Sequence, residues 1–342
     1  MRNGNGGRTP LPRVLMSPGP GDAMPNPYNR LLVKSVHSKA IVRRFTWRNA
    51  LIGPYDVMHV HWPEALLFSR GRVRAYLKAV LLRLLVIRLR LTKSVLVWTV
   101  HNEAPHDRLS RGHMRVFSCF TASAKARIHL NNFSAESYVS SSQTVRDVVI
   151  PHGLYPASGE GYDIPSQGNQ LLFFGAIRPY KGVDRLVATF VDLSTSAQLR
   201  IIGQPSDPAL ANALQALAAP DERVSTSFRY FTDSELDKEI LAAAGVILPY
   251  SAMTNSGVAL LALSRGRPIL APAVPAILEL QNEVGVEWVH TFDGVISGQD
   301  IEDFLEALQH PRTGSPDLSK RSWEVIGALH LKLYYELLGD AG

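Results

Sequence analysis

Short apolar runs alternate with longer helical stretches along the first half of the chain. The runs predict β-strands at residues 13–16, 57–60, 94–100, 126–130 and 148–150. Strands that alternate with helices are typical of a doubly wound α/β domain, because each crossover helix covers one face of a parallel sheet. The pattern therefore predicts a Rossmann-like domain over residues 12–152, after a Gly-, Asn- and Pro-rich lead-in at residues 1–11 that we expect to be disordered.

The same alternation starts again in the second half. Strands are predicted at 171–174, 198–202, 246–248 and 269–271, and helices at 183–192, 207–217, 233–243 and 257–264. We expect a second Rossmann-like domain over residues 170–320, joined to the first by a Ser-, Gly- and Pro-rich linker at 153–169. The final segment, 321–342, is predicted to hold a helix that crosses back to the first domain. The default ligand site is then a cleft between two facing domains.

The composition is that of an ordinary globular protein, with 342 residues, 46% of them apolar. The single cysteine, Cys119, excludes an internal disulfide and a cysteine-rich zinc site, and it favours a reducing compartment. No apolar stretch has the length of a signal peptide core at the N-terminus or of a membrane span elsewhere. We therefore expect a cytoplasmic protein.

One basic segment, from Arg70 to Lys93, accounts for the net charge of +6. It holds eight basic residues and no acidic one, which leaves 28 basic and 30 acidic residues in the rest of the chain. Leucine, valine and isoleucine recur between these cations at helical spacing, so the segment is a candidate for binding an anionic membrane surface at the inner face of the cell membrane. The alternative is a helix whose leucines pack on its own sheet, and one helix can do both. Nucleic acid is not expected, because no binding motif accompanies the charge.

The strand predicted at 171–174 runs into a turn that carries a glycine and two cations. Gly175 lets the backbone turn sharply where a side chain would obstruct a ligand, and Arg178 and Lys181 follow in the same loop. Open α/β sheets bind ligands at this carboxyl edge. A planar guanidinium and a compact ammonium suit the two phosphates of a nucleotide-sugar and neutralise the leaving group. A solvated basic loop is the alternative interpretation.

A second anion site is predicted where the strand at 246–248 leads into the helix at 257–264. Three capping residue types and a glycine precede the helix, and a helix N-terminus with free N–H groups attracts phosphate. An ordinary capped helix is the alternative, but the cationic turn at the same sheet edge favours a shared donor site. The residues expected to bind the donor are Gly175, Arg178, Lys181, Tyr250, Thr254, Asn255, Ser256 and Gly257.

These motifs resemble those of GT-B glycosyltransferases. In the second half the resemblance is carried by residues 174–182, 201–203, 248–250 and 265–270, and it covers most of residues 150–340. A narrower resemblance, to the β-mannosyltransferases of xanthan assembly, extends over nearly the whole chain. It is carried by Asn26-Pro27-Tyr28, His59-Val60-His61-Trp62-Pro63-Glu64, Thr99-Val100-His101-Asn102, Pro105-His106, Asn255-Ser256-Gly257 and Leu261-Ala262-Leu263-Ser264.

The resemblance implies a GT-B fold of two Rossmann-like domains and a hexosyltransferase activity. It implies mannose transfer from GDP-mannose onto a polyprenyl-diphosphate-linked oligosaccharide in exopolysaccharide assembly, at the cytoplasmic membrane. Two alternatives stay open. One is the same fold with a UDP-sugar such as UDP-glucose or UDP-glucuronate, and the other is a non-catalytic protein that binds a nucleotide-sugar.

The chain departs from the broad GT-B pattern at two positions. Many retaining members carry two glutamates there, and this chain has Thr254 and Ala262, so a retaining mechanism does not carry over. Inversion needs a general base to deprotonate the acceptor hydroxyl. Among the first domain's strand-end loops, the favoured bases are Asp107 and Glu64, with His106 as a further candidate.

Other polar residues in the first half are expected on the acceptor side of the cleft. They are Asn26, Tyr28, His61, His101, Asn102 and His152. No metal site and no cofactor are expected: His59 and His61 alternate on one strand, and we take them to point to opposite faces, which would prevent joint ligation. Gly19-Pro20-Gly21 lacks the third glycine of a dinucleotide fingerprint, which argues against an NAD enzyme.

Overall fold

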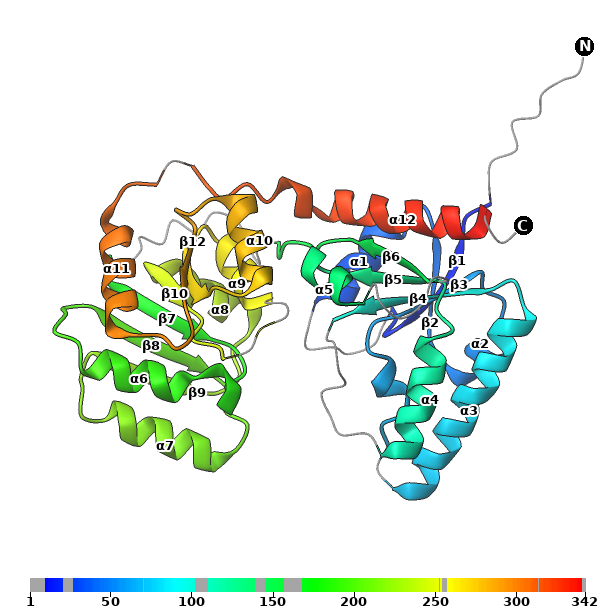
Figure 1. Ribbon diagram of the computed structural model, residues 1–342, viewed down its shortest axis with the longest axis horizontal. Helices are drawn as coiled ribbons and strands as arrows, with labels where there is room; N and C mark the ends of the chain where they lie inside the picture. Colours follow the sequence, from blue (N-terminus) through cyan, green and yellow to red (C-terminus); the bar gives the residue numbers. More distant parts are fainter. Residues whose placement is uncertain are drawn as a thin grey trace, which may run out of the picture. The chain divides into compact units, whose positions relative to one another are not determined.

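The computed structural model describes residues 10–20, 27–69, 71–101, 110–138, 145–156, 168–251, 253, 257–312 and 314–339. The chain divides into two compact units, one formed by Met1–Gly153 with Arg321–Gly342 and the other by Leu154–Lys320. Each unit has its own six-stranded sheet, in which the paired strands run parallel, with helices on both faces (Figure 1). The fold is therefore α/β, as the alternation of apolar runs predicts.

The first unit contains the sheet with strand order β2-β1-β3-β4-β5-β6. Its strands are β1 (Arg13–Ser17), β2 (Ile41–Arg44), β3 (Val57–Val60), β4 (Val95–Val100), β5 (Ala126–His129) and β6 (Arg146–Val149). Its helices are α1 (Tyr28–Val36), α2 (Trp47–Ile52), the 3-10 helix η1 (Pro63–Leu66), α3 (Arg72–Leu91), α4 (Arg111–Thr121), α5 (Asn132–Tyr138) and α12 (Trp323–Gly339). All residues of β3, β4 and β5 are buried, because helices cover both faces of these central strands.

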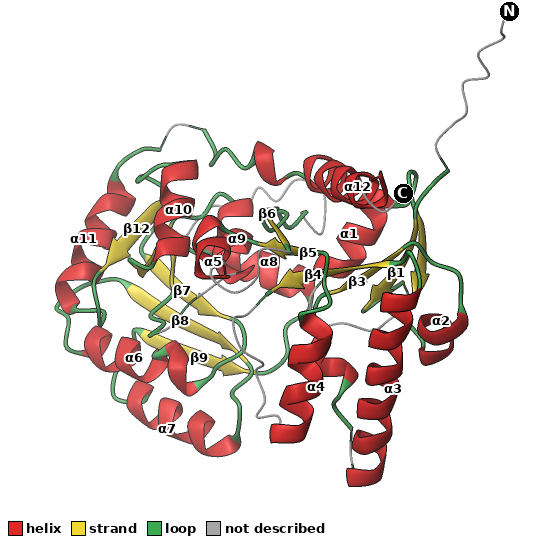
Figure 2. Ribbon diagram, turned by 45° about the vertical axis from the view of Figure 1, so that its right-hand side comes forward, coloured by secondary structure: helices red, strands yellow, loops and turns green. Residues whose placement is uncertain are grey.

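Alternate residues of each strand feed two separate cores, one on each face of this sheet. Leu96 and Met58 pack with α3 and α4 on one face, while Val95 and Val57 pack with α1 and α12 on the other. Figure 2 shows α3 and α4 side by side, and α12 beside α1. The last helix thus belongs to the core of the first unit although its sequence follows the second.

The second unit contains the sheet with strand order β12-β11-β10-β7-β8-β9. Its strands are β7 (Gln170–Phe174), β8 (Gln198–Gly203), β9 (Val224–Phe228), β10 (Gly245–Ile247), β11 (Ile269–Pro272) and β12 (Val289–Phe292). Its helices are η2 (Pro179–Lys181), α6 (Val183–Val191), α7 (Pro208–Ala218), α8 (Asp233–Ala242), α9 (Gly257–Ser264), α10 (Pro275–Val284) and α11 (Gly298–Gln309), and η3 (Ser319–Arg321) leads to α12. The four predicted strands and four predicted helices of this half are all confirmed within a few residues.

Helix α3 is the longest in the chain's described part, with 20 residues. It carries cations along its length, and none of the described helices combines the length and the hydropathy that a bilayer crossing requires.

Candidate functional site

The predicted cationic turn lies where β7 ends. Gly175 has a φ of +110°, a conformation that L side chains rarely adopt, and a Cβ there would lie 3.8 Å from Nζ of Lys181. The chain then forms η2 and passes through Gly182, which has a φ of +62°, into α6. The missing side chain at Gly175 therefore leaves space directly in front of the Lys181 ammonium.

Lys181 is a buried cation, with 8% of its surface exposed. Its Nζ lies 4.8 Å from the ring centroid of Tyr250, and no described carboxylate pairs with it. Burial, with a smaller contribution from the positive charge of Arg178, lowers the pKa of Lys181 to about 8. A desolvated ammonium without a counter-charge is costly, so the site is prepared for an anion.

Arg178 lies on the exposed side of the same turn. Its Nη1 donates to the carbonyl of Ile177, which leaves the other guanidinium nitrogens without a hydrogen-bond partner within the described segments. The sequence prediction that Gly175, Arg178 and Lys181 occupy one turn at the carboxyl edge of the sheet is thus confirmed, and the turn offers one buried and one exposed cation.

The loop after β10 is fastened to this turn. Ser251 donates from both its N–H and its hydroxyl to the carbonyl of Tyr180, at 3.0 and 2.9 Å. Tyr250 is buried under the turn, and burial raises the pKa of its phenol. Tyr250, which was predicted to bind the nucleotide-sugar, therefore contacts the Lys181 ammonium through the face of its ring. Sequence spacing alone does not reveal this contact.

Helix α9 begins at Gly257, beside the same turn. A methyl group of Val258, the next residue, lies 3.5 Å from the ideal Cβ position of Gly175, and a Cβ at Gly257 would lie 2.7 Å from the hydroxyl of Tyr155. Thr254, Asn255 and Ser256 lie outside the described residues. Ala262, where a retaining enzyme would carry a glutamate, is fully buried in the core.

Polar aromatic side chains gather at the carboxyl edge of the first unit's sheet. The ring of Tyr28 lies edge-on to the rings of His61, His101 and His152, with centroid distances of 5.5, 5.3 and 4.7 Å. Nδ1 of His61 lies 3.1 Å from Nε2 of His101, and His101 stacks on Trp62 at 4.3 Å. The structure therefore brings together four of the six residues predicted on the acceptor side.

Another hydrogen-bonded histidine, His59, lies next to His61 of this cluster. Nε2 of His59 lies 2.7 Å from the hydroxyl of Thr99, and Nδ1 lies 2.7 Å from the hydroxyl of Tyr334 on α12. The expectation that His59 and His61 point to opposite faces is wrong. Residues two apart in a strand share a face, and the two rings lie 4.3 Å apart. Tyr334 and its bond to His59 were not predicted, because a contact across 275 positions leaves no local signal.

Burial keeps His59, His61 and His152 neutral near pH 7. Desolvation lowers the pKa of His59 and of His61 well below the ordinary value, and it lowers the pKa of His152 to about 4. Nε2 of His61 is buried and has no hydrogen-bond partner within the described ranges. A neutral imidazole such as that of His61 can form a hydrogen bond with a hydroxyl group, whereas a charged imidazolium would be costly to bury here.

Of the three predicted catalytic bases, only Glu64 lies within the described residues. Glu64 lies in η1 at the end of β3 and is 8% exposed. Asp107 and His106 lie outside the described residues, as do Asn26 and Asn102. The described part of the chain contains no group of three or more His, Cys, Asp or Glu side chains placed to hold a metal ion.

The chain is similar to known glycosyltransferases in sequence. A family model described as "Glycosyl transferases group 1" matches residues 168–310, the part of the chain that carries the cationic turn. A GDP-mannose:glycolipid 4-beta-D-mannosyltransferase from Xanthomonas campestris pv. campestris is 35% identical over 335 residues, which cover 96% of this chain and 93% of the relative.

Solved structures share the fold. A sucrose-phosphate synthase from Thermosynechococcus elongatus superposes with a TM-score of 0.64 at 16% identity, over 97% of this chain and all of that one. A glycosyltransferase from Rickettsia africae superposes with a TM-score of 0.63 at 13% identity, over 96% and 99% of the two chains. The GT-B architecture expected from the motifs is therefore the architecture of this chain.

Proposed function

Because the chain belongs to the GT-B glycosyltransferase family of the GDP-mannose:glycolipid 4-β-D-mannosyltransferases, we propose that it transfers mannose from GDP-mannose to a lipid-linked oligosaccharide. The glycosyltransferase activity follows from the family. The donor, the polyprenyl-diphosphate acceptor and a place in exopolysaccharide assembly are the proposed part.

The observation that carries the proposal is the buried ammonium of Lys181. It lies at the carboxyl edge of the second sheet, without a described counter-charge, behind a glycine that leaves space in front of it. A diphosphate in that space would supply the missing negative charge, and Arg178 at the rim would bind a second phosphate oxygen. We propose that these two cations, rather than a metal ion, balance the diphosphate.

The proposed reaction is a displacement at the anomeric carbon. The acceptor oxygen forms a bond to this carbon, and the bond from the carbon to the phosphate oxygen breaks. The electron pair leaves with GDP, whose growing negative charge Lys181 and Arg178 stabilise. The hydroxyl proton passes to a base of the first unit, for which Asp107, Glu64 and His106 remain the candidates.

We propose that the reaction inverts the anomeric centre. The mannose of GDP-mannose is α-linked, so a β-linked product such as the one in the relatives' name requires attack from the opposite face. The alanine at position 262 is consistent with this route, because it supplies no carboxylate of the kind that retaining members use.

A turnover assay tests the proposal. Wild-type protein incubated with GDP-mannose and a polyprenyl-diphosphate oligosaccharide should release GDP and give a product one hexose heavier, with a β-linkage. Lys181→Met should reduce turnover by at least a hundredfold, because the leaving group loses its buried cation. Arg185→Gln removes an exposed cation four residues further on, in α6, and should leave turnover unchanged.

The same assay separates the alternatives. If UDP-glucose or UDP-glucuronate is consumed and GDP-mannose is not, the donor assignment is wrong while the site assignment stands. If Lys181→Met turns over at the wild-type rate, the assignment of the diphosphate site is wrong.

We also propose that α3 attaches the protein to the cytoplasmic face of the membrane. The helix has two apolar faces. One is buried against the sheet, and the other points to solvent. The exposed face recurs in steps of four and three residues and consists of Val73, Leu77, Val80, Leu84, Ile87 and Leu91. Five of these six are 47 to 81% exposed, so the face has no partner within the described chain.

Cations border this exposed face, which favours an anionic bilayer as its occupant. Arg72, Arg83 and Arg90 are exposed, and at 100° per residue they fall along one side of the apolar face. Arg88 has a different role: its guanidinium donates to the carbonyls of Ala50 and Gly53 and lies 4.4 Å from the ring of Tyr55. Both interpretations of the basic helix are thus supported, on opposite faces.

Sedimentation with vesicles tests the attachment. Wild-type protein should sediment with vesicles that contain phosphatidylglycerol and be released by high salt. Leu84→Gln with Ile87→Gln should abolish sedimentation, whereas Leu217→Gln, at an exposed leucine of α7, should not change it. Arg88 is unsuitable for this test, because its replacement would remove hydrogen bonds within the unit. Self-association through α3 in place of vesicle binding would overturn the proposal.

A further inference from the structure

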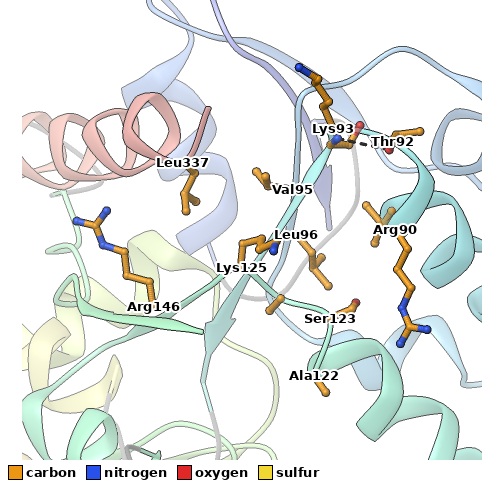
Figure 3. Close-up of a pocket in the computed structure, with 13 residues that line it drawn as sticks. Arg90, Thr92, Lys93, Val95, Leu96, Ala122, Ser123, Lys125, Arg146 and Leu337 are labelled. Carbon is orange, nitrogen blue, oxygen red and sulfur yellow. Dashed lines mark hydrogen bonds between the residues drawn. The ribbon is translucent and has the colours of Figure 1, made fainter. Parts of the chain in front are cut away.

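A cavity of about 740 Å³ lies in the first unit, at the edge of the sheet opposite to the histidine cluster (Figure 3). It is lined by the amino ends of β4 and β5, by Arg146 of β6, and by the C-terminal ends of α3 and α4. Val95 lies in its wall, and the same strand carries His101 beyond its other end, roughly 20 Å away at the rise of a β-strand. The cavity is therefore no part of the proposed transfer site.

Four cations and no carboxylate line this cavity. Arg90 and Lys93 lie on one side, Arg146 on the other and Lys125 between them (Figure 3). Arg146 is partly neutralised by Glu336, whose carboxylate lies 2.8 Å from its guanidinium. The other three form no ion pair with any residue that the structure describes.

Cations near helix C-termini are common, because the helix dipole favours them there. Arg90 in the last turn of α3 fits that explanation. The helix dipole does not explain Lys125 and Arg146 in this way, because neither residue belongs to a helix. They lie at the starts of adjacent strands, where their backbone N–H groups bond within the sheet. They nevertheless line the same cavity as Arg90 and Lys93, so that basic residues from both helical and strand segments surround it (Figure 3).

The hollow also has an apolar part. Leu89, Leu96 and Leu337 line it together with the cations. A ligand that fits both has a phosphate group for the guanidinium and ammonium groups and an uncharged glycerol or hydrocarbon part for the leucines.

We propose that this cavity is a binding site for a phosphate-bearing group, either the headgroup of an anionic lipid or a soluble phosphate ester. The charge of the cavity suits either kind of ligand. The cavity is also next to the exposed apolar face of α3, because Arg90 lines the cavity and the next residue, Leu91, is 81% exposed on that face. The proposal does not depend on the sugar transfer, because its residues lie on the opposite edge of the sheet.

Ligand titration of the full-length protein, followed by phosphorus NMR line broadening, tests the site. The probes are dihexanoylphosphatidylglycerol below its micelle concentration, sn-glycerol 3-phosphate, and dihexanoylphosphatidylcholine as the zwitterionic control. Wild-type protein should bind the phosphatidylglycerol, either alone or together with glycerol 3-phosphate. It should bind the phosphatidylcholine much more weakly. Lys125→Gln should bind about tenfold more weakly, the effect expected when one charge-assisted hydrogen bond is lost.

Lys238→Gln, at an exposed lysine of α8, is the charge-matched control and should bind like the wild type. Phosphate bound at the donor site would be insensitive to Lys125→Gln, so the two sites are distinguished. Binding of phosphatidylglycerol alone identifies a lipid headgroup, and equal binding of glycerol phosphate identifies a soluble ester. Wild-type binding by Lys125→Gln with an unchanged urea midpoint, or no binding of any anionic probe, would overturn the proposal.

Discussion

The ammonium of Lys181 lies 4.8 Å from the ring of Tyr250, in a buried position that lowers its pKa to about 8. The charged form binds a diphosphate and the neutral form does not. GDP affinity should therefore be constant below pH 8 and fall by up to about tenfold for each pH unit above it. Calorimetric titration of GDP between pH 7 and 9 measures this. Lys181→Arg keeps its charge throughout that range, and its affinity should not change with pH. A GDP affinity of the wild type that does not change between pH 7 and 9 would show that the Lys181 ammonium does not bind the diphosphate.

Gly182 should be intolerant of a side chain. Its φ is +62°, and a Cβ would collide with the carbonyl oxygen of Pro249. Gly182→Ala should lose about 2–4 kcal/mol of unfolding free energy, since it adds backbone strain to a clash. Gly266→Ala has the same strain, at a φ of +64°, but nothing within 4 Å of the new Cβ. Urea unfolding should show a clearly smaller loss for Gly266→Ala, and equal losses would mean that the Pro249 contact is unimportant.

The bond between His59 and Tyr334 should contribute to the attachment of α12. Both groups are buried, and Nδ1 of His59 lies 2.7 Å from the phenol oxygen. Tyr334→Phe leaves a buried imidazole nitrogen without that partner, which should cost about 1–3 kcal/mol. Tyr335→Phe removes a phenol at the next, less buried position and is the control. Urea unfolding at pH 7 measures both, and a Tyr334→Phe protein as stable as the control would contradict this account.

Acid should destabilise the first unit through its buried histidines. Burial lowers the pKa of His330 to about 4, whereas the unfolded chain has an ordinary value near 6.5. The neutral form stabilises the fold fully above pH 6.5, and this contribution is lost as the pH falls from 6.5 to 4, by up to about 3 kcal/mol. Nδ1 of His330 donates to the carbonyl of Ile326, a bond that the amide of His330→Asn can reproduce. Unfolding free energies of the variant should fall less steeply between pH 6.5 and 5; an equally steep fall would exclude His330 as a cause.

Sequence patterns were sufficient for the interior of both sheets and insufficient for three of the edges. The central strands β3, β4 and β7 are mostly apolar, because helices cover them on both faces, and β8 becomes apolar towards its carboxyl end. The edge strands β2, β9 and β12 were not predicted. Most residues of β2 are exposed, and most residues of β9 are only partly buried, so charged and hydroxyl side chains interrupt the apolar signal.

The donor turn was predictable because its residues are neighbours in sequence. Gly175, Arg178 and Lys181 occupy seven positions between a strand and a helix, and the strand end fixes where they lie. The histidine cluster was predicted only as a set of separate residues. The stacking of His101 on Trp62 and the pairing of His59 with Tyr334 depend on strand register and on the return of α12, which no local pattern encodes.

Equilibrium urea unfolding with and without GDP tests the central claim, that Lys181 is a buried cation prepared for a diphosphate. Lowering the Lys181 pKa from 10.5 to about 8 costs the ligand-free fold up to about 3 kcal/mol below pH 8, and this cost disappears as the pH rises to 10.5. Lys181→Met should therefore be more stable than the wild type at pH 7 without ligand, and should gain nothing from GDP. The wild type and Arg185→Met should both gain stability as GDP is raised above its dissociation constant. A Lys181→Met protein that is stabilised by GDP as much as the wild type would contradict the account.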